Sequence, residues 1–116
     1  MNFYNYTGEP IAYCVDESIY LFDGTPVGYF VNEAIYNYDG KHLGWFENGW
    51  IRDLNGDCVF YSNNASGGPI KPVSQIPPVK SVRAIKPVSS VREVRKVKSV
   101  YSLSWSKFSD EKFFKW

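Results

Sequence analysis

Hydrophobic and turn-forming positions recur every sixteen residues through the first half of the chain. The repeat is marked by four glycines, each preceded by a residue that favours turns: Thr7-Gly8, Asp23-Gly24, Asp39-Gly40 and Asn55-Gly56. An Asp-Gly or Asn-Gly pair between apolar segments favours a tight type I′ turn, because glycine adopts positive φ without steric cost. The pattern predicts four β-hairpins within residues 1–69, each a short strand, a glycine turn and a second strand.

Aliphatic and aromatic residues stand at fixed distances from each glycine. Three positions after it come Ile11, Val27, Leu43 and Val59, and five positions after it come Tyr13, Tyr29, Trp45 and Tyr61. These two sets share one face of each strand, and an isolated hairpin is marginal in water. We therefore expect the four hairpins to pack around a pseudo-four-fold axis, with both sets stacked as layers of the core. A stacking platform for sugars or bases is the alternative role of the aromatic set.

From residue 70 onwards the hydrophobic period changes to three. Twelve aliphatic residues occupy every third position: Ile70, Val73, Ile76, Val79, Val82, Ile85, Val88, Val91, Val94, Val97, Val100 and Leu103. This spacing drifts around an α-helix and does not match the alternation of a strand. A polyproline II helix has three residues per turn, so the pattern lines one edge of such a helix. Residues 70–104 are therefore predicted as an extended segment of about 105 Å that docks on the hairpin module through its aliphatics. Because a compact domain is much shorter than this, the docked segment must either wrap around the module or fold back on it.

A second edge of the same segment is basic. Lysine or arginine directly follows seven of the aliphatics, at Lys71, Lys80, Arg83, Lys86, Arg92, Arg95 and Lys98. Residues 70–100 have eight basic residues and one acidic residue, net +7, whereas residues 1–69 have nine acidic and two basic residues, net −7. Either the basic edge packs on the acidic module of the same molecule, or it meets an anionic partner such as a nucleic acid. The first arrangement predicts docking that weakens at high salt.

The fourth repeat departs from the others and supplies the candidate binding residues. It holds the only histidine, two tryptophans, and an arginine where the earlier copies have tyrosine: His42, Trp45, Trp50 and Arg52. One interpretation is a contact surface for a ligand. The other is structural, with Arg52 paired to Asp53 or Glu47 and His42 as a turn residue.

The last segment, residues 105–116, is rich in aromatic side chains. They are Trp105, Phe108, Phe113, Phe114 and Trp116. The run Ser109-Asp110-Glu111 predicts a cap that opens one helical turn. Five exposed aromatics would be costly, so we expect them to cover an open end of the hairpin module; docking on a protein partner or a membrane surface is the alternative.

Composition limits the chemistry that this chain can carry. Its 116 residues are one folding unit, and no apolar run approaches the ~18 residues of a membrane span. The N-terminus lacks the pattern of a secretory signal, which makes a cytoplasmic location the expectation. Cys14 and Cys58, expected as reduced thiols, and one histidine are too few ligands for an ordinary zinc site, and no cofactor is expected. Since no nucleophile and base can be paired, we expect a non-enzymatic binding or structural module.

The two periodicities together resemble those of the bacterial four-fold beta flower family, a small all-β domain of four hairpin petals about an axis. The matching stretches are residues 22–29, 40–46, 49–53, 67–69, 71–73, 86–88 and 104–106. They are spread over nearly the whole chain. The resemblance implies an all-β fold, and because the family carries no assigned activity, it implies no mechanism and no site residues.

Overall fold

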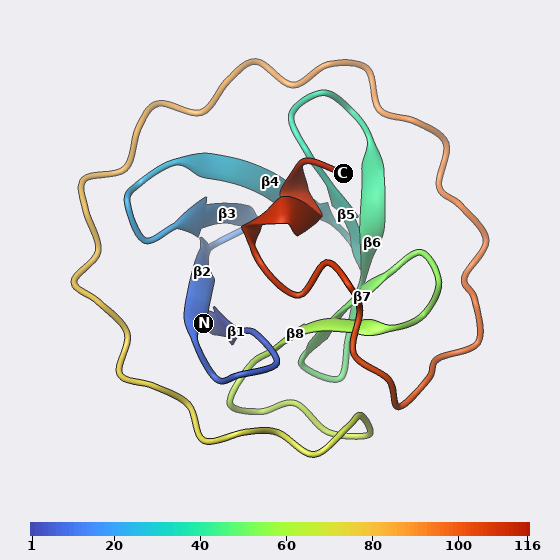
Figure 1. Cartoon of the computed structure of the whole chain (residues 1–116). Helices are drawn as coiled ribbons and strands as arrows, with labels where there is room; N and C mark the ends of the chain where they lie inside the picture. Colours follow the sequence, from blue (N-terminus) through green and yellow to red (C-terminus); the bar gives the residue numbers. More distant parts are fainter.

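The computed structural model describes all 116 residues and shows eight short antiparallel strands that close into one barrel (Figure 1). In chain order the strands are β1 Asn2–Tyr4, β2 Pro10–Val15, β3 Ser18–Leu21, β4 Pro26–Val31, β5 Ala34–Tyr36, β6 His42–Glu47, β7 Trp50–Asp53 and β8 Cys58–Tyr61. Each strand pairs with the next one, and β8 closes on β1. The predicted all-β fold of four repeated hairpins is confirmed.

The four repeat glycines lie in the turns β1–β2, β3–β4, β5–β6 and β7–β8, and all four have positive φ. In the second of these turns, the Gly24 N–H donates to Leu21 O and the Leu21 N–H donates to Thr25 O. Asp23, before the glycine, does not have positive φ. This geometry is a type I turn followed by a left-handed glycine, so the predicted type I′ turn is wrong.

A second series of turns joins the hairpins to one another. The links β2–β3, β4–β5 and β6–β7 each begin with a polar residue of positive φ, and these residues are Asp16, Asn32 and Asn48. They too are sixteen residues apart, and Asp and Asn tolerate this left-handed conformation better than other side chains do. Short turns thus connect all consecutive strands, and the pairing of β8 with β1 closes the sheet without a free edge.

Large and small side chains face each other across the glycine-turn hairpins inside the barrel. The inward pairs are Phe3 with Ala12, Ile19 with Gly28, Ile35 with Gly44, and Ile51 with Phe60. The large residues of the first three pairs are fully buried, and the small partners leave space beside them. A Cβ atom on Gly44 would lie 3.2 Å from the Phe113 ring, which shows that the C-terminal segment uses this space.

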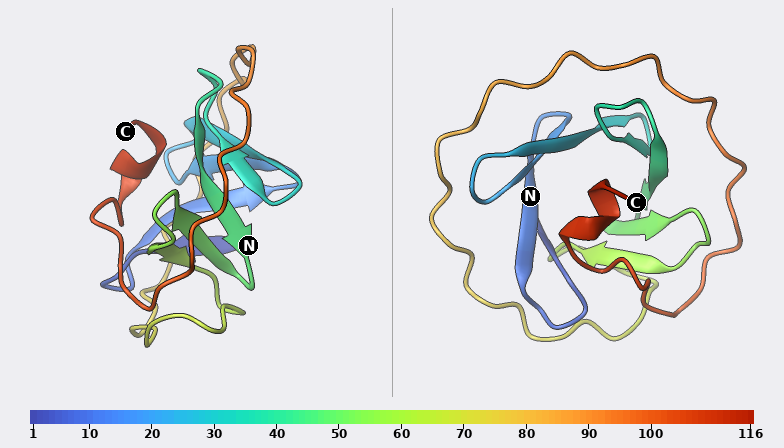
Figure 2. Two further views of the ribbon diagram at one scale, coloured as in Figure 1. Left: turned by 90° about the vertical axis from the view of Figure 1, so that its right-hand side faces the viewer. Right: turned by 45° about the horizontal axis from the view of Figure 1, so that its top comes forward.

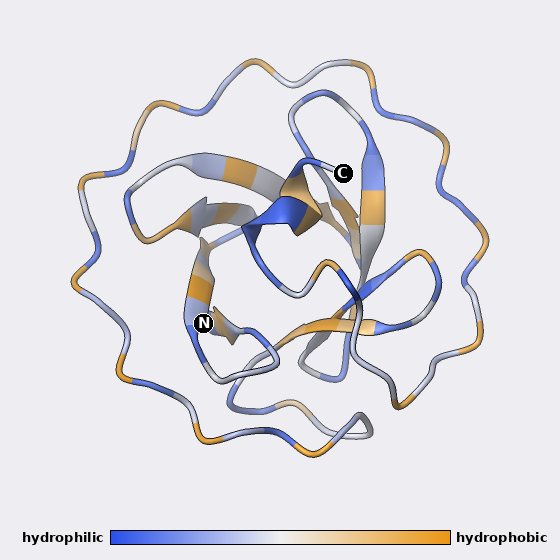
Figure 3. Cartoon of the chain, in the orientation of Figure 1, coloured by the Kyte–Doolittle hydropathy of each residue, from blue (hydrophilic) through white to orange (hydrophobic).

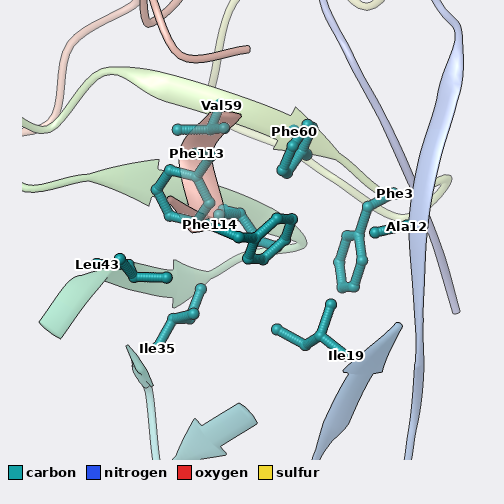
Figure 4. Packing of buried hydrophobic residues seen from close by; sticks show 10 residues of the cluster. Phe3, Ala12, Ile19, Ile35, Leu43, Val59, Phe60, Phe113 and Phe114 are labelled. Atoms are coloured by element: carbon teal, nitrogen blue, oxygen red, sulfur yellow. The ribbon is translucent and has the colours of Figure 1, made fainter. Parts of the chain in front are cut away.

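The C-terminal segment closes one end of the barrel. Its 3-10 helix η1, Glu111–Phe114, begins at Asp110, whose side chain accepts from the Lys112 N–H as the sequence predicts. Phe113 and Phe114 are buried against Phe60 in the central cluster (Figure 4). These two aromatics therefore cover an end of the hairpin module and are not available to a partner.

The predicted core layers are placed differently from the expectation. Leu43 and Val59 are buried in the central cluster, but Ile11 and Val27 are only partly buried against it. The aromatic set lies on the outer side of the sheet, where Tyr13 stacks on Tyr20 at a centroid distance of 5.8 Å. The interior is formed mainly by residues paired across the glycine-turn hairpins, such as Ile19 and Ile35, together with Leu43 and Val59. Strand alternation points the aromatic set to the opposite face of the sheet.

Residues 70–104, here called the strap, run once around the barrel (Figures 1 and 2). The strap contains no helix or strand, and its polyproline II conformation stays a prediction. The molecule measures 36 × 36 × 22 Å. An extended strap of about 105 Å nearly matches the perimeter, about 113 Å, of a circle 36 Å across. The segment therefore wraps the hairpins, as its length requires.

Backbone hydrogen bonds hold the strap at every ninth residue. Its N–H groups donate to the carbonyls of the repeat glycines: Gln75 to Gly8, Ala84 to Gly24, Glu93 to Gly40 and Ser102 to Gly56, at 2.8–3.1 Å. Two residues before each donor, the carbonyl of Val73, Val82, Val91 or Val100 occupies the place that a Cβ on the glycine would need. Nine strap residues thus match one hairpin of sixteen residues, and the two repeats run in register around the ring.

The twelve aliphatic side chains of the strap, here called the aliphatic band, point away from the barrel. Each is 71–95 % exposed. Along the ring in Figure 3, hydrophobic stretches of the chain, drawn in orange, alternate regularly with hydrophilic ones. The hypothesis that their burial docks the strap is wrong. Since the carbonyls of residues such as Val82 and Val91 face the glycines, the strap approaches the barrel with its backbone, and its branched side chains are left outside.

Adding one methyl group at a repeat glycine tests this close approach. Gly24→Ala and Gly40→Ala are each expected to release the neighbouring part of the strap, because the new Cβ meets a strap carbonyl and the left-handed backbone costs ~1–2 kcal/mol. Limited trypsin digestion with mass spectrometry should then show faster cleavage within residues 70–100.

The matched control is Gly67→Ala. Gly67 also has positive φ, but nothing lies within 4 Å of its added Cβ. Equal cleavage of the strap in Gly24→Ala and Gly67→Ala would contradict the close-approach mechanism.

Candidate functional site

The strap cations lie over aromatic rings on the outer side of the barrel. Five of the predicted anion contacts approach a ring centroid to 4.6–6.0 Å: Lys80 on Tyr13, Arg83 on Tyr20, Arg92 on Tyr36, and both Arg95 and Lys98 on Trp45. The remaining two bond to oxygens, Lys71 Nζ to Ala65 O at 2.9 Å and Lys86 Nζ to Ser18 Oγ at 3.3 Å. A cation over a ring face is attracted by the ring quadrupole. The outer aromatics are therefore the platform on which the basic edge rests.

Ion pairs contribute little to this arrangement. Only Lys98 lies within 4 Å of carboxylates, at 3.4 Å from Glu33 and 3.5 Å from Glu47. Exposed pairs of this kind contribute about 0–1 kcal/mol each. The acidic residues of the barrel thus seldom form ion pairs with the basic residues of the strap. Most strap cations remain without a carboxylate partner.

His42 is fully buried and joins two strap segments to β6. Its Nε2 lies 2.9 Å from Gly44 O, and its Nδ1 accepts the Lys96 N–H at 3.0 Å. The pair of contacts assigns the proton to Nε2, since Nδ1 must be an acceptor. The His42 N–H donates to Glu93 Oε1 at 2.8 Å. His42 is therefore a latch for the strap, and Glu93, which the sequence analysis counted only as a charge, is its partner.

Arg52 is the second buried latch, at the point where the strap ends. Its Nη1 donates to Gly56 O and to Ser102 O, both at 2.7 Å, and its guanidinium lies 4.3 Å from the centroid of the Tyr101 ring. Asp53 and Glu47 are not its ion-pair partners, so the predicted pairing is wrong. The planar guanidinium fork reaches two carbonyls at once, one from the glycine turn and one from the strap.

The four candidate binding residues do not form an exposed surface. His42, Trp50 and Arg52 are at most 3 % exposed, and Trp45 is 6 % exposed. Trp50 packs edge-on against Trp105 at 5.5 Å, and Trp45 lies beneath Arg95 and Lys98. These residues differ from their counterparts in the other repeats because they hold the strap and the segment that follows it. The strap ends at this part of the barrel, and the chain then turns inwards.

The thiols lie in different surroundings. Cys14 and Cys58 are both free, and burial raises the pKa of the Cys58 thiol to about 11. A thiol with this pKa is almost entirely protonated near pH 7.

No group of three or more His, Cys, Asp or Glu side chains is placed to hold a metal ion. No helix has the length and apolarity that crossing a membrane requires.

The side chains that stabilise the glycine turns were not predicted from the sequence. Asn5, Asn37 and Asp53 stand three residues before a repeat glycine, and the Oδ1 of each accepts two backbone N–H groups of its turn. They stand 32 and 16 residues apart, multiples of the repeat length, and this spacing was the available signal. They hold the glycine turns in the shape that the strap meets.

A cavity of about 560 Å³, here called the corner pocket, opens between the strap and the outer side of β3 and β4. Its charged and aromatic walls include Tyr20, Tyr29, Tyr38, Arg83, Lys86 and Arg92. Asp16 and Glu17 from the β2–β3 turn, Ser18 at the start of β3 and Ser89 of the strap complete its polar lining. The structure thus brings three of the predicted anion contacts together and spreads the others around the ring.

The comparisons with known proteins agree with this architecture. The model of a family described as 4-fold beta flower protein matches residues 1–114 of the chain. No curated protein and no solved structure matches it.

Protonation of His42 is expected to weaken the fold in mild acid. Burial, the largest cause, lowers the pKa of His42 below its ordinary value of 6.5. As the pH falls, the unfolded chain therefore binds a proton at this histidine before the folded chain does. The contribution of His42 to the free energy of unfolding is fully present above about pH 6.5. Below that pH the free energy of unfolding falls by at most ~1.4 kcal/mol per pH unit. Denaturant unfolding followed between about pH 5 and pH 7.5 measures this slope.

The variant His42→Gln is the control for this slope. His42 is the only histidine, so the dependence in this window should flatten in the variant, whatever its overall stability. An unchanged slope would assign the effect to other groups and contradict the latch.

Proposed function

This chain belongs to the 4-fold beta flower family, and we propose that it is a non-enzymatic binding module whose contact surface is the aliphatic band. The observation that carries the proposal is the outward direction of this band. Twelve large aliphatics are exposed on a segment whose backbone is bonded to the barrel along its length.

An exposed apolar row of this extent favours an interaction surface. Single exposed aliphatics are common on soluble proteins, whereas contiguous apolar surface usually marks a contact site. Val82, Ile85 and Val91 are each at least 94 % exposed. Because the strap is already ordered, a partner meets the side chains in a fixed arrangement, which lowers the entropy cost of binding.

The charge around the band favours an acidic protein as partner. Residues 70–100 carry net +7, so the bands of two copies repel each other, while carboxylates on a partner attract them. The fitting surface offers shallow apolar pockets with acidic residues between them. Aliphatic contact would supply the affinity, and the cations would guide the approach.

The proposal of a binding role also agrees with the state of the reactive side chains. Both ring nitrogens of His42 are occupied by backbone groups, and the Cys58 thiol has a raised pKa. Neither is poised as a nucleophile or a general base.

Nucleic-acid binding is the second candidate, favoured by the free cations of the strap. The side chains of Arg83 and Arg92 make no hydrogen bond or ion pair. A nucleic-acid complex would weaken steeply with salt, because each phosphate contact releases counterions. A complex held by the aliphatic band would depend on salt much less.

Serine replacement of the band tests the first candidate. In the combined variant Ile85→Ser, Val88→Ser, Val94→Ser, the free energy of unfolding should change by no more than ~0.5 kcal/mol per site, since all three side chains are exposed. A photo-crosslinker at Val91 would identify a bound protein. The purified partner should then bind the wild-type chain and lose affinity for the serine variant by about tenfold or more.

The matched control exchanges small strap residues outside the aliphatic band, in Ala84→Ser with Ser89→Ala. It should bind like the wild type. Equal binding by the serine variant, or crosslinks to nucleic acid alone, would overturn the proposal.

A further inference from the structure

The corner pocket carries hydroxyl groups that the next corner of the barrel lacks. Moving one repeat of sixteen residues along the chain replaces Ser18, Tyr29 and Tyr38 with Ala34, Trp45 and Leu54. The fold is the same at both corners, because the hairpins pair in equivalent register. The difference between the corners is therefore chemical: one is lined by hydroxyls, and the other is filled by a tryptophan.

The cations of the two corners also differ in what they contact. In the next corner, Arg95 donates to Val31 O at 2.6 Å and Lys98 pairs with Glu33. In the corner pocket, Arg83 and Arg92 lie against tyrosine rings and have no oxygen partner. Their guanidinium groups keep all their hydrogen-bond donors for a ligand, and this fork matches a phosphate or carboxylate.

One wall of the pocket holds an unsatisfied hydroxyl. Tyr29 Oη is buried and has no hydrogen-bond partner, and leaving a buried polar atom without one is costly. Tyr38 Oη donates only a long bond, 3.4 Å, to Gly28 O. Burial raises the pKa of Tyr38, so this hydroxyl stays protonated and able to donate. Tyr29 Oη therefore has a hydrogen bond to gain from a ligand oxygen, and Tyr38 Oη can exchange its long bond for a shorter one.

The opposite charges at the mouth restrict the kind of anion. Asp16 and Glu17, from the β2–β3 turn, line the same cavity and form no ion pair. Their oxygens accept hydrogen bonds and repel a ligand that is anionic throughout. A ligand with one charged end and one hydroxylated end satisfies both sides, and tyrosine rings offer apolar faces to the carbons between them. A volume of about 560 Å³ suits a molecule of this size.

We propose that the corner pocket binds a hydroxylated organic phosphate, of the sugar-phosphate class. The phosphate lies beside Arg83 and Lys86, and the hydroxyl end faces Asp16 and Glu17. This site does not depend on the aliphatic band or on its partner.

Calorimetric titration of the full chain with glucose 6-phosphate at low ionic strength tests the site. Glucose 6-phosphate should bind more tightly than inorganic phosphate, and glucose alone should show no saturable binding. The double variant Arg83→Gln, Lys86→Gln should raise the dissociation constant by about tenfold or more. Tyr38→Phe, which removes one hydroxyl and no charge, should raise it about threefold.

The matched control removes the same charge from the next corner, in Arg95→Gln with Lys98→Gln. It should change the dissociation constant less than twofold, with melting temperatures confirming that every variant is folded. No saturable heat at millimolar glucose 6-phosphate would overturn the proposal. Equal losses in the two double variants, or preferential binding of single-stranded DNA that both variants weaken, would also overturn it.

Discussion

The close approach between the strap backbone and the four glycine turns is the constraint on which the rest of the structure depends. At each turn a strap N–H reaches the glycine carbonyl, and a strap carbonyl fills the space beside the glycine Cα. This contact needs glycine twice over, for the left-handed backbone and for the missing Cβ. It also satisfies part of a long extended backbone that has no hydrogen bonds of its own.

The same constraint determines which side chains meet solvent. A strap that docks through its backbone turns its branched aliphatics outwards and leaves its cations over the outer tyrosines and tryptophan. The barrel interior is completed by the C-terminal Phe113 and Phe114 instead. The aliphatic band, the basic edge and the corner pocket lined with hydroxyls therefore all result from the way the strap docks. Both proposed binding surfaces lie on the strap or beside it.

Much of the fold could be predicted from residue spacing. The glycines at positions 8, 24, 40 and 56 predicted the hairpins, and the aliphatics of residues 70–103 predicted an extended segment. The candidate site was predicted poorly. His42 and Arg52 stood out because they break the repeat, but their hydrogen-bond partners on the strap lie 50–54 residues away in sequence. Residue type alone does not show whether such a side chain meets a ligand or its own backbone.

By itself the sequence determined the two periods, sixteen and three, and with them the kind of local structure in each half. Local periodicity follows from backbone geometry, which is the same wherever a segment lies. The tertiary structure alone decided that nine strap residues match one hairpin, that Val82 and its counterparts face outwards, and that Arg83 and Arg92 share a cavity with Tyr29. These outcomes depend on which groups can approach within hydrogen-bond distance, and one Cβ more or less at a glycine turn is enough to change that.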